Sequence, residues 1–265
     1  MYDLLEVRYF LDQFKLAGDV YIINDDMWAE AKRKLKERFG GSSNLEICNN
    51  LIRDFEAATP ISKYKQDLEL FVRESKLEDF YGDNGETVLV STIHKAKGHE
   101  FDNVFLMLNQ INAETDENLR QLYVAMTRAK TNLTIHYNGD FLEAIKTEAL
   151  IKVFDKATYL PPNQLTMQLT HKDVWLNYFA FRQPLISQLN SEDKLKIDGE
   201  FCSNLKEQRV LAFSKPCSNQ IDGLRQKNYV PTNAKIRFIV YWKKKDSTED
   251  EIKIILPELN FERKN

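Results

Sequence analysis

Polar and charged side chains are concentrated in the segment VSTIHKAKGHEFDNV, residues 90–104, between two apolar runs. Thr92 and backbone amides near Gly98 could donate hydrogen bonds to phosphate oxygens, and Lys97 adds positive charge. Glu100 could accept a hydrogen bond from a sugar hydroxyl. These residue types predict contact with a nucleotide or with a nucleic-acid backbone. The alternative is an ordinary loop with incidental polarity.

A second group of chemically capable residues lies in LYVAMTRAK, residues 122–130. Arg128 ends a predicted helix that also carries Tyr123 and Thr127, and the helix leads into the apolar run at 132–137. Ligands of open α/β sheets bind in the crevice beyond the carboxyl ends of the strands. We expect the first segment to follow a strand at that edge and Arg128 to reach the same edge.

The apolar runs around these two segments alternate with a helical pattern. TVLVST (87–92), NVFLML (103–108) and NLTIHY (132–137) are short, β-branched or aromatic runs typical of strands. Between the last two runs, apolar residues including Leu119 and Leu122 follow a helical spacing. This alternation predicts an α/β layer with a mostly parallel sheet.

Upstream of this layer, apolar residues recur at helical spacing over residues 2–80, which predicts several amphipathic helices. Turn and helix-stop residues predict breaks at Gly18, Gly40–Gly41, Ser42–Ser43 and Thr59–Pro60. The segment VYIINDD, residues 20–26, resembles a strand that ends in an acidic pair. Because no phosphate loop precedes it, we expect a helix start capped by Asp25 or Asp26.

The C-terminal part combines a helical pattern with short strand patterns. LPPNQ, residues 160–164, is interpreted as a linker, and a helical stretch is expected over 171–189. Three strand-like runs follow at 208–214, 234–244 and 251–257. They predict a small, mostly β domain of the SH3-like or barrel type.

Charge is unevenly distributed along the chain, which has a formal net charge of -3. Residues 201–245 contain ten Lys or Arg and two acidic residues, a charge of +8, so the remainder carries -11. This asymmetry is typical of a module that contacts a polyanion, and solvated lysines are the alternative. Four aromatic residues in the C-terminal half of this segment fit either a nucleic-acid surface or a core, and they are Tyr229, Phe238, Tyr241 and Trp242. Alternation in KIRFIVYW places Ile236, Phe238 and Val240 on one strand face and Arg237, Ile239 and Tyr241 on the other.

The composition argues against several classes of protein. A hydrophobic content of 43% permits real cores, while no run of about 18 apolar residues predicts a membrane span. The charged N-terminal segment does not resemble a cleavable signal, so we expect a cytoplasmic protein. Cys48, Cys202 and Cys217 form no Cys-x-x-Cys pair, and the four histidines are scattered. Neither a disulfide framework nor a metal site is expected.

The segments VSTIHKAKGHEFDNVFL and ENLRQLYVAMTRAKTNLTI resemble motifs V and VI of UvrD/Rep/PcrA-type superfamily 1 DNA helicases. The resemblance covers directly about residues 86–140 and implies the second RecA-like domain of such an enzyme. It implies that Arg128 acts as an arginine finger on the γ-phosphate of ATP. It also implies that Glu100 binds the ribose, and that Gly98 allows a close approach of the backbone in this nucleotide-binding region.

The same resemblance implies contacts with DNA and a supporting role for two residues. Thr92 and His94 would lie against the backbone of single-stranded DNA, with Lys97 close by. Tyr123 and Thr127 would help to fix the helix that carries the arginine.

The chain departs from the family pattern at three points. His99 stands where leucine is usual, and Gln121 stands where an apolar residue is usual, although neither change removes a catalytic group. More importantly, no G-x-x-x-x-G-K-[ST] phosphate loop occurs among the nine glycines. ATP and Mg²⁺ are therefore expected only in the complete helicase, and the isolated chain is not expected to hydrolyse ATP.

We thus expect an α/β chain with a helical region at 1–81, a RecA-like core at 82–160, and a C-terminal helix plus small basic β domain at 161–265. The resemblance implies the C-terminal part of an ATP-dependent DNA helicase, completed by an N-terminal helicase domain in cis or in trans. Its expected partner is single-stranded or junction DNA, with no membrane. The alternative is a non-catalytic DNA- or protein-interaction module that retains a helicase-like scaffold.

Overall fold

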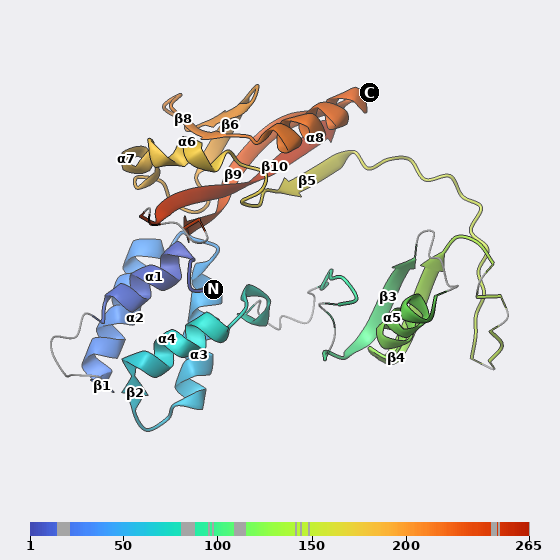
Figure 1. Cartoon of the computed structure of the whole chain (residues 1–265), viewed down its shortest axis with the longest axis horizontal. Helices are drawn as coiled ribbons and strands as arrows, with labels where there is room; N and C mark the ends of the chain where they lie inside the picture. Colours follow the sequence, from blue (N-terminus) through green and yellow to red (C-terminus); the bar gives the residue numbers. More distant parts are fainter. Residues whose placement is uncertain are drawn as a thin grey trace. The chain divides into compact units, whose positions relative to one another are not determined.

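The computed structural model describes residues 1–14, 22–80, 88–94, 96, 98–108, 115–140, 142–143, 145–147, 149–244, 248 and 250–264. The chain divides into two units (Figure 1). The first unit joins residues 1–82 to residues 160–265, and the second consists of residues 83–159. The first unit therefore brings together the two ends of the sequence.

Short helices form the N-terminal part of the first unit. They are α1 (Leu5–Asp12), α2 (Asp25–Phe39), α3 (Leu45–Ala58), α4 (Lys65–Glu74) and the 3₁₀ helix η1 (Leu77–Phe80), with β1 (Ile22–Ile23) paired to β2 (Lys63–Tyr64). Their apolar faces enclose a helical core in which Phe10, Phe14 and Trp28 form ring contacts. The amphipathic helices and the breaks at 40–43 and 59–60 are confirmed, and Gly18 lies outside the described residues.

The start of α2 corrects one detail of the prediction. Asn24 is the N-cap, because its backbone is extended and its Oδ1 accepts a hydrogen bond from the backbone N–H of Met27 at 2.8 Å. Asp25 and Asp26 already belong to the first helical turn, where their negative charges face the positive end of the helix dipole. The helix start is confirmed, whereas the choice of Asp25 or Asp26 as the cap is wrong.

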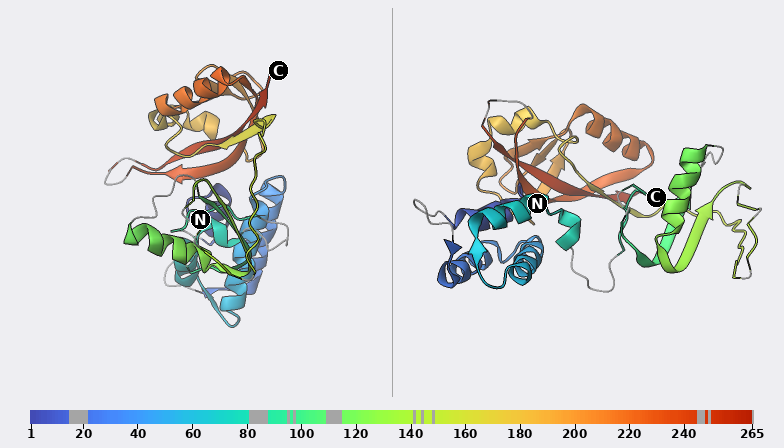
Figure 2. Two further views of the ribbon diagram at one scale, coloured as in Figure 1. Left: turned by 90° about the vertical axis from the view of Figure 1, so that its right-hand side faces the viewer. Right: turned by 60° about the horizontal axis from the view of Figure 1, so that its bottom comes forward.

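The C-terminal part of the first unit is an antiparallel sheet of six strands that curls into half a barrel (Figures 1 and 2). In sheet order the strands are β5 (Gln164–Gln168), β10 (Ile252–Arg263), β9 (Tyr229–Trp242), β6 (Lys194–Asp198), β7 (Phe201–Ser203) and β8 (Arg209–Ala212). The accompanying helices are α6 (Leu176–Ala180), α7 (Gln183–Ile186) and α8 (Lys215–Gln226). The helical stretch expected over 171–189 is thus two short helices, with Pro184 in the first turn of the second. A mostly β region is present, and α8 within it was not predicted.

A β-bulge interrupts the alternation predicted along β9. In the β9–β10 ladder, Leu256 pairs with Phe238 and the next residue, Pro257, pairs with Ile236. Arg237 of β9 is therefore left without a partner. The shift coincides with Pro257, which has no N–H group to donate to the ladder. Ile236 consequently packs in the core of the sheet, while Phe238 packs against the helical core. The prediction that these two residues share one strand face is wrong.

The helices and the sheet of the first unit are held together through β9. Leu4 forms a β-bridge with Val240, and the backbone N–H of Tyr241 donates to the carbonyl oxygen of Asp3 at 2.8 Å. Because β9 buries side chains in both cores, residues 1–82 and 160–265 pack as one unit.

The second unit contains the parallel strands β3 (Phe101–Leu108) and β4 (Ala129–Tyr137), connected through α5 (Asp116–Met126). Leu106 and Leu108 pack against Leu122 and Ala125 of the helix. The predicted strands at 103–108 and 132–137, their parallel arrangement and the intervening helix are confirmed. No helix in the described part of the chain is long and apolar enough to span a bilayer.

The strand predicted at 87–92 is absent from its described part, residues 88–92. Val88 and Val90 are 82% and 90% exposed, respectively. A β-branched run becomes a strand only when a neighbouring strand takes up its backbone hydrogen bonds and a layer covers its side chains. Among the described residues neither is present beside this run.

Candidate functional site

The two polar segments meet at the amino ends of β3 and β4. The loop of residues 92–100 leads into β3, and Arg128 immediately precedes β4. The backbone N–H of Phe101 donates to the carbonyl oxygen of Arg128 at 2.9 Å, and Phe101 is paired with Ala129. The segments therefore lie at one edge. It is the amino edge and not the carboxyl edge that we expected, because each segment directly precedes one of these two parallel strands.

The guanidinium of Arg128 is held by three oxygen atoms. Nε donates to the carbonyl of Val124 at 3.0 Å, Nη1 to the carbonyl of His99 at 3.2 Å, and Nη2 to Oγ1 of Thr127 at 3.2 Å. A guanidinium has five N–H donors, so the described residues leave two of them available. Arg128 is half-buried, and its orientation is fixed from both α5 and the loop before β3.

The loop before β3 is ordered by turns and by one apolar anchor. The N–H of Ala96 donates to the carbonyl of Thr92 at 3.1 Å, and the N–H of His99 donates to the carbonyl of Ala96 at 3.2 Å. Gly98 has a φ of +92°, a conformation that other L-residues rarely adopt. Ile93 packs against the core of the second unit. This packing fixes Ile93 of the polar loop to the core formed by α5, β3 and β4, next to Arg128.

The polar side chains predicted for this loop are exposed wherever the structure describes them. Thr92 and His94 flank Ile93, which anchors the loop. Glu100 directly follows His99, whose carbonyl accepts the hydrogen bond from Arg128. Glu100 is thus adjacent in sequence to a residue that binds Arg128, and Gly98 lies at the turn between Glu100 and His94. Lys97 lies outside the described residues.

The helix α5 presents Arg128 through an ordinary amphipathic arrangement. Oγ1 of Thr115 accepts a hydrogen bond from the N–H of Asn118 at the start of the helix. Thr127, the C-cap, donates its hydroxyl to the carbonyl of Val124 at 3.0 Å and accepts from Arg128. The ring of Tyr123 is exposed, and its backbone carbonyl accepts from the N–H of Thr127. Thr127 thus contacts the arginine directly, whereas Tyr123 lies one turn away.

Two groups that orient Arg128 could not be found from residue types. They are the backbone carbonyls of His99 and Val124, which any residue would supply. No carboxylate among the described residues lies within 4.0 Å of the guanidinium nitrogens of Arg128. The arginine is therefore oriented without being neutralised there.

One face of the parallel sheet is not covered by the described residues of the second unit. Phe105 and Met107 point away from α5 and are 65% and 76% exposed. Parallel sheets are normally covered on both faces. An exposed apolar sheet face usually marks a surface that contacts another protein segment.

The basic segment of residues 201–245 is partly neutralised within the first unit. Lys235 and Arg237 bind Glu192 at 3.1 and 3.4 Å, and further ion pairs join Arg209 to Asp198 and Arg225 to Asp222. Among the described residues, five lysines of this segment have no acidic partner, and they are Lys206, Lys215, Lys227, Lys243 and Lys244. The charge of +8 therefore overstates the free positive charge of this segment.

The four aromatic residues considered above for a nucleic-acid surface, which lie on β9, do not form an exposed row. Tyr229 is buried and donates its hydroxyl to the carbonyl of Pro162 at 2.5 Å. Phe238 packs against the helical core and Trp242 against the sheet core, while Tyr241 lies beneath Arg8. The core alternative is confirmed for Tyr229, Phe238 and Trp242, whereas Tyr241 is half-buried and packs against Arg8 outside both cores.

The described residues contain no group of three or more His, Cys, Asp or Glu side chains arranged to hold a metal ion. The three cysteines are buried free thiols. Burial, with a smaller contribution from the charge of Asp173, raises the pKa of Cys217 to about 12. A raised pKa makes Cys217 a poor nucleophile.

Comparison with known proteins relates this site to one family. Residues 9–140 match the family model of the UvrD-like helicase C-terminal domain. A stretch of 56 residues is 43% identical to the RecBCD enzyme subunit RecB of Chlamydia pneumoniae, and it covers 20% of this chain and 5% of that protein. The matched part is thus a small fraction of that relative. No solved structure gives a significant match.

Proposed function

Because the chain carries a UvrD-like helicase C-terminal domain over residues 9–140, we propose that it supplies one side of the ATP site of a DNA helicase. The observation that carries this proposal is the arrangement of Arg128. Its guanidinium is held by three neutral oxygens, and two of its N–H donors are not used by the described residues.

This arrangement suits the stabilisation of a phosphoryl-transfer transition state. Negative charge spreads over the γ-phosphate oxygens as the bond to the leaving group breaks, and a positioned guanidinium can donate to two of them. Because Arg128 is already oriented, little reorganisation is needed as this charge develops. We assign Arg128 as the arginine finger. ATP and Mg²⁺ would be held mainly by a partner domain that contains a phosphate loop.

The other residues of the two polar segments are assigned the roles that the motif resemblance implies. Glu100 would accept a hydrogen bond from the ribose of ATP, beside the turn at Gly98. Thr92 and His94, together with Lys97, would contact the backbone of single-stranded DNA. Thr127 would support the arginine by accepting one of its hydrogen bonds.

The uncovered sheet face supports a partner domain. Phe105 and Met107 lie on strand β3, which leads away from the proposed nucleotide site. Covering that face by further protein would remove apolar side chains from water. The proposed partner is an N-terminal helicase domain, in cis or in trans.

The decisive experiment uses the longer polypeptide or complex that supplies the phosphate loop. Arg128→Ala should lower DNA-stimulated ATP turnover by about 10³- to 10⁵-fold, the range observed when an arginine finger is lost. Lys130→Ala is the matched control, because it removes an exposed cation two residues away. The isolated chain should show no turnover with or without single-stranded DNA.

Thermal unfolding separates this role from a structural one. If Arg128→Ala lowers the melting temperature while the folded protein hydrolyses ATP at the normal rate, Arg128 only holds the helix and the loop together. That result would favour a non-catalytic interaction module with a helicase-like scaffold. Turnover by the isolated chain at about 1 to 100 per second would also overturn the proposal.

A further inference from the structure

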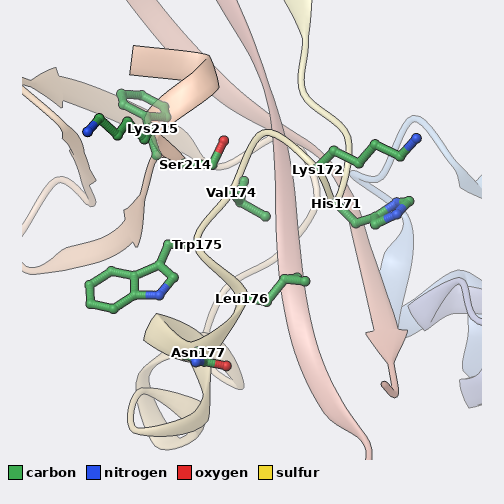
Figure 3. Close-up of a pocket in the computed structure, with 9 residues that line it drawn as sticks. His171, Lys172, Val174, Trp175, Leu176, Asn177, Ser214 and Lys215 are labelled. Carbon is green, nitrogen blue, oxygen red and sulfur yellow. The ribbon is translucent and has the colours of Figure 1, made fainter. Parts of the chain in front are cut away.

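An open pocket of about 690 Å³ lies in the sheet region of the first unit (Figure 3). It is lined by the loop at 171–177 and by the turn at 213–215, which leads into α8. The pocket is separate from the residues assigned to the nucleotide site, all of which belong to the second unit. Its lining combines an exposed aromatic ring, two lysines and a helix N-terminus.

Trp175 is the aromatic residue of the pocket, and it is 55% exposed. Its backbone is fixed, because its N–H donates to the carbonyl of Ala212 at 2.9 Å and the preceding Val174 forms a β-bridge with Phe213. Single exposed apolar side chains are common on protein surfaces, so Trp175 indicates a contact surface only together with the rings and cations beside it.

A row of rings continues from Trp175 across neighbouring elements. Its ring centroid lies 6.2 Å from that of Tyr178 on α6, which in turn lies 6.0 Å from that of Phe201 on β7. Arg182 lies over the ring of Tyr178 at 5.3 Å, and Arg209 lies over Phe201 at 4.3 Å. Aromatic rings interleaved with cations are typical of surfaces on which bases stack beside a phosphate backbone.

The charged groups around the row are available to an anion. Lys172 and Lys215 are exposed, and within the described chain neither they nor Arg182 has an acidic partner within 4.0 Å. In the view of Figure 3 their ammonium groups extend to opposite sides of the pocket, with the indole of Trp175 on the side of Lys215. Arg209 lies 3.7 Å from Asp198 in an exposed pair, which competes only weakly with a phosphate.

The start of α8 adds a further positive contribution at the pocket. Ser214 is the N-cap of this 12-residue helix and accepts a hydrogen bond from the N–H of Cys217. The N-terminus of a helix carries a partial positive charge that favours nearby anions. Lys215 is the first residue of the helix, so its side-chain charge and the helix dipole act at the same place.

We propose that this pocket and the adjoining ring row bind single-stranded DNA, with one base stacked on Trp175 and phosphates beside Lys172 and Lys215. The inference rests on the proposed helicase function only for the choice of DNA as the polyanion. Single strands are favoured over duplex because the exposed ring of Trp175 needs an unpaired base on which to stack. The surface would give the chain a second DNA contact, in a unit different from that of Thr92 and His94.

The test measures binding of the whole 265-residue chain to a fluorescein-labelled dT₂₀ oligonucleotide by anisotropy at several salt concentrations. Trp175→Ala should weaken binding about tenfold, as expected for the loss of one stacked base, and Trp175→Phe should weaken it less. Lys172→Ala combined with Lys215→Ala should weaken binding and reduce the slope of log K against log salt by about 1.4, or roughly 0.7 per lost phosphate contact.

A matched double variant, Lys36→Ala with Lys194→Ala, removes the same charge from two exposed lysines that do not line the pocket. It should leave affinity within about twofold of the native chain. The inference is overturned if this control weakens binding as much as the pocket variant does, because general attraction would then suffice. It is also overturned if the native chain binds no dT₂₀, or if Trp175→Ala binds normally.

Competition and ATPase measurements separate base stacking from simple charge attraction, and the pocket from the nucleotide site. If unlabelled polyglutamate displaces dT₂₀ as effectively as unlabelled dT₂₀ does, the pocket recognises negative charge alone and the DNA assignment fails. The proposed ATPase role is tested separately through Arg128 in the longer protein. If ATP turnover depends on Arg128 but the pocket variants bind DNA normally, the proposed DNA contact at the pocket is overturned and the proposed ATPase role is not.

Discussion

Arg128 and His99 are joined by a hydrogen bond of 3.2 Å between a guanidinium nitrogen and a backbone carbonyl, across 29 positions of sequence. A second bond runs in the opposite direction close by, from the N–H of Phe101 to the carbonyl of Arg128 at 2.9 Å. The two bonds connect the loop before β3 to the end of α5. A change in that loop would therefore also alter the orientation of the arginine.

Arg128→Lys should retain the fold and positive charge but recover only part of the ATPase activity of the complete helicase. Lysine carries a compact ammonium group and cannot donate from fixed nitrogens to Val124, His99 and a phosphate together. We expect kcat to lie between that of the native enzyme and that of Arg128→Ala. Steady-state kinetics with saturating single-stranded DNA measures this, and equal rates for lysine and alanine would show that the charge alone contributes nothing.

Glu100→Ala should affect a different kinetic parameter. A hydrogen bond to ribose is made equally in the ground state and in the transition state, so its loss raises KM for ATP while kcat changes little. Loss of one such bond should raise KM by about tenfold. Glu117→Ala is a suitable control, because this exposed glutamate lies in the first turn of α5. A fall in kcat at unchanged KM would contradict the ribose assignment.

The chemistry of the site could be predicted because it depends on residue types in order. Thr92, Glu100 and Arg128 are recognisable in a single sequence, and the helix between the two strands follows from apolar spacing. Their support could not be predicted, because the carbonyl that binds Arg128 would be the same if position 99 held leucine. The expected strand at 87–92 failed for a related reason, since strand formation depends on neighbours that a local apolar pattern does not specify.

The sheet region shows the same limit on a larger scale. A single bulge at Arg237 moves Phe238 to the helical core, against the alternation of the sequence. The pocket beside Trp175 joins two segments about 40 positions apart, at 171–177 and 213–215. Charge counting drew attention to the segment 201–245, but it did not identify the lysines that keep their charge unpaired.

Glu192 should make the stability of the first unit dependent on pH. Burial raises the pKa of its carboxyl, but hydrogen bonds from Ser43 and Lys235 and the charges of Lys235 and Arg237 outweigh this effect, so the pKa is lowered. A carboxyl group with a lowered pKa in the folded state contributes its full stabilisation at pH values above the unfolded-state pKa, which is about 4.3. This stabilisation is lost as the pH falls through the folded-state pKa.

Glu192→Gln should therefore lower the free energy of unfolding at pH 7 by about 1 kcal/mol, a figure reduced for partial exposure. The difference between native and variant protein should shrink as pH falls below about 4. Urea unfolding at pH 7, 5 and 3 measures this difference in stability. Glu200→Gln is the control, because Glu200 is exposed and forms no ion pair with a described side chain. A difference that is constant over this range would contradict the proposed origin of the effect.

Glu6 should be more important for the junction between helices and sheet than any surface ion pair. Its carboxylate is fully buried, and Oε1 accepts hydrogen bonds from Ser42 at 2.6 Å, Ser191 at 2.8 Å and Asn44 at 3.3 Å. Asn44 also donates to the carbonyl of Arg237 on β9 at 3.0 Å. The donors come from the α2–α3 connection and from the segment before β6, so one carboxylate on α1 joins the helical core to the sheet.

Glu6→Leu fills a similar volume but leaves these buried donors without their acceptor, at a cost of about 1–3 kcal/mol for each one that finds no substitute. We expect the free energy of unfolding to fall by about 3 kcal/mol. Glu6→Gln should cost less, because the amide retains an acceptor oxygen, and its NH₂ group replaces Oε2, which has no partner among the described residues. Urea unfolding followed by circular dichroism measures both variants. Equal stability of the leucine and glutamine variants would show that the donors are satisfied without Glu6, and the junction would then depend on apolar packing alone.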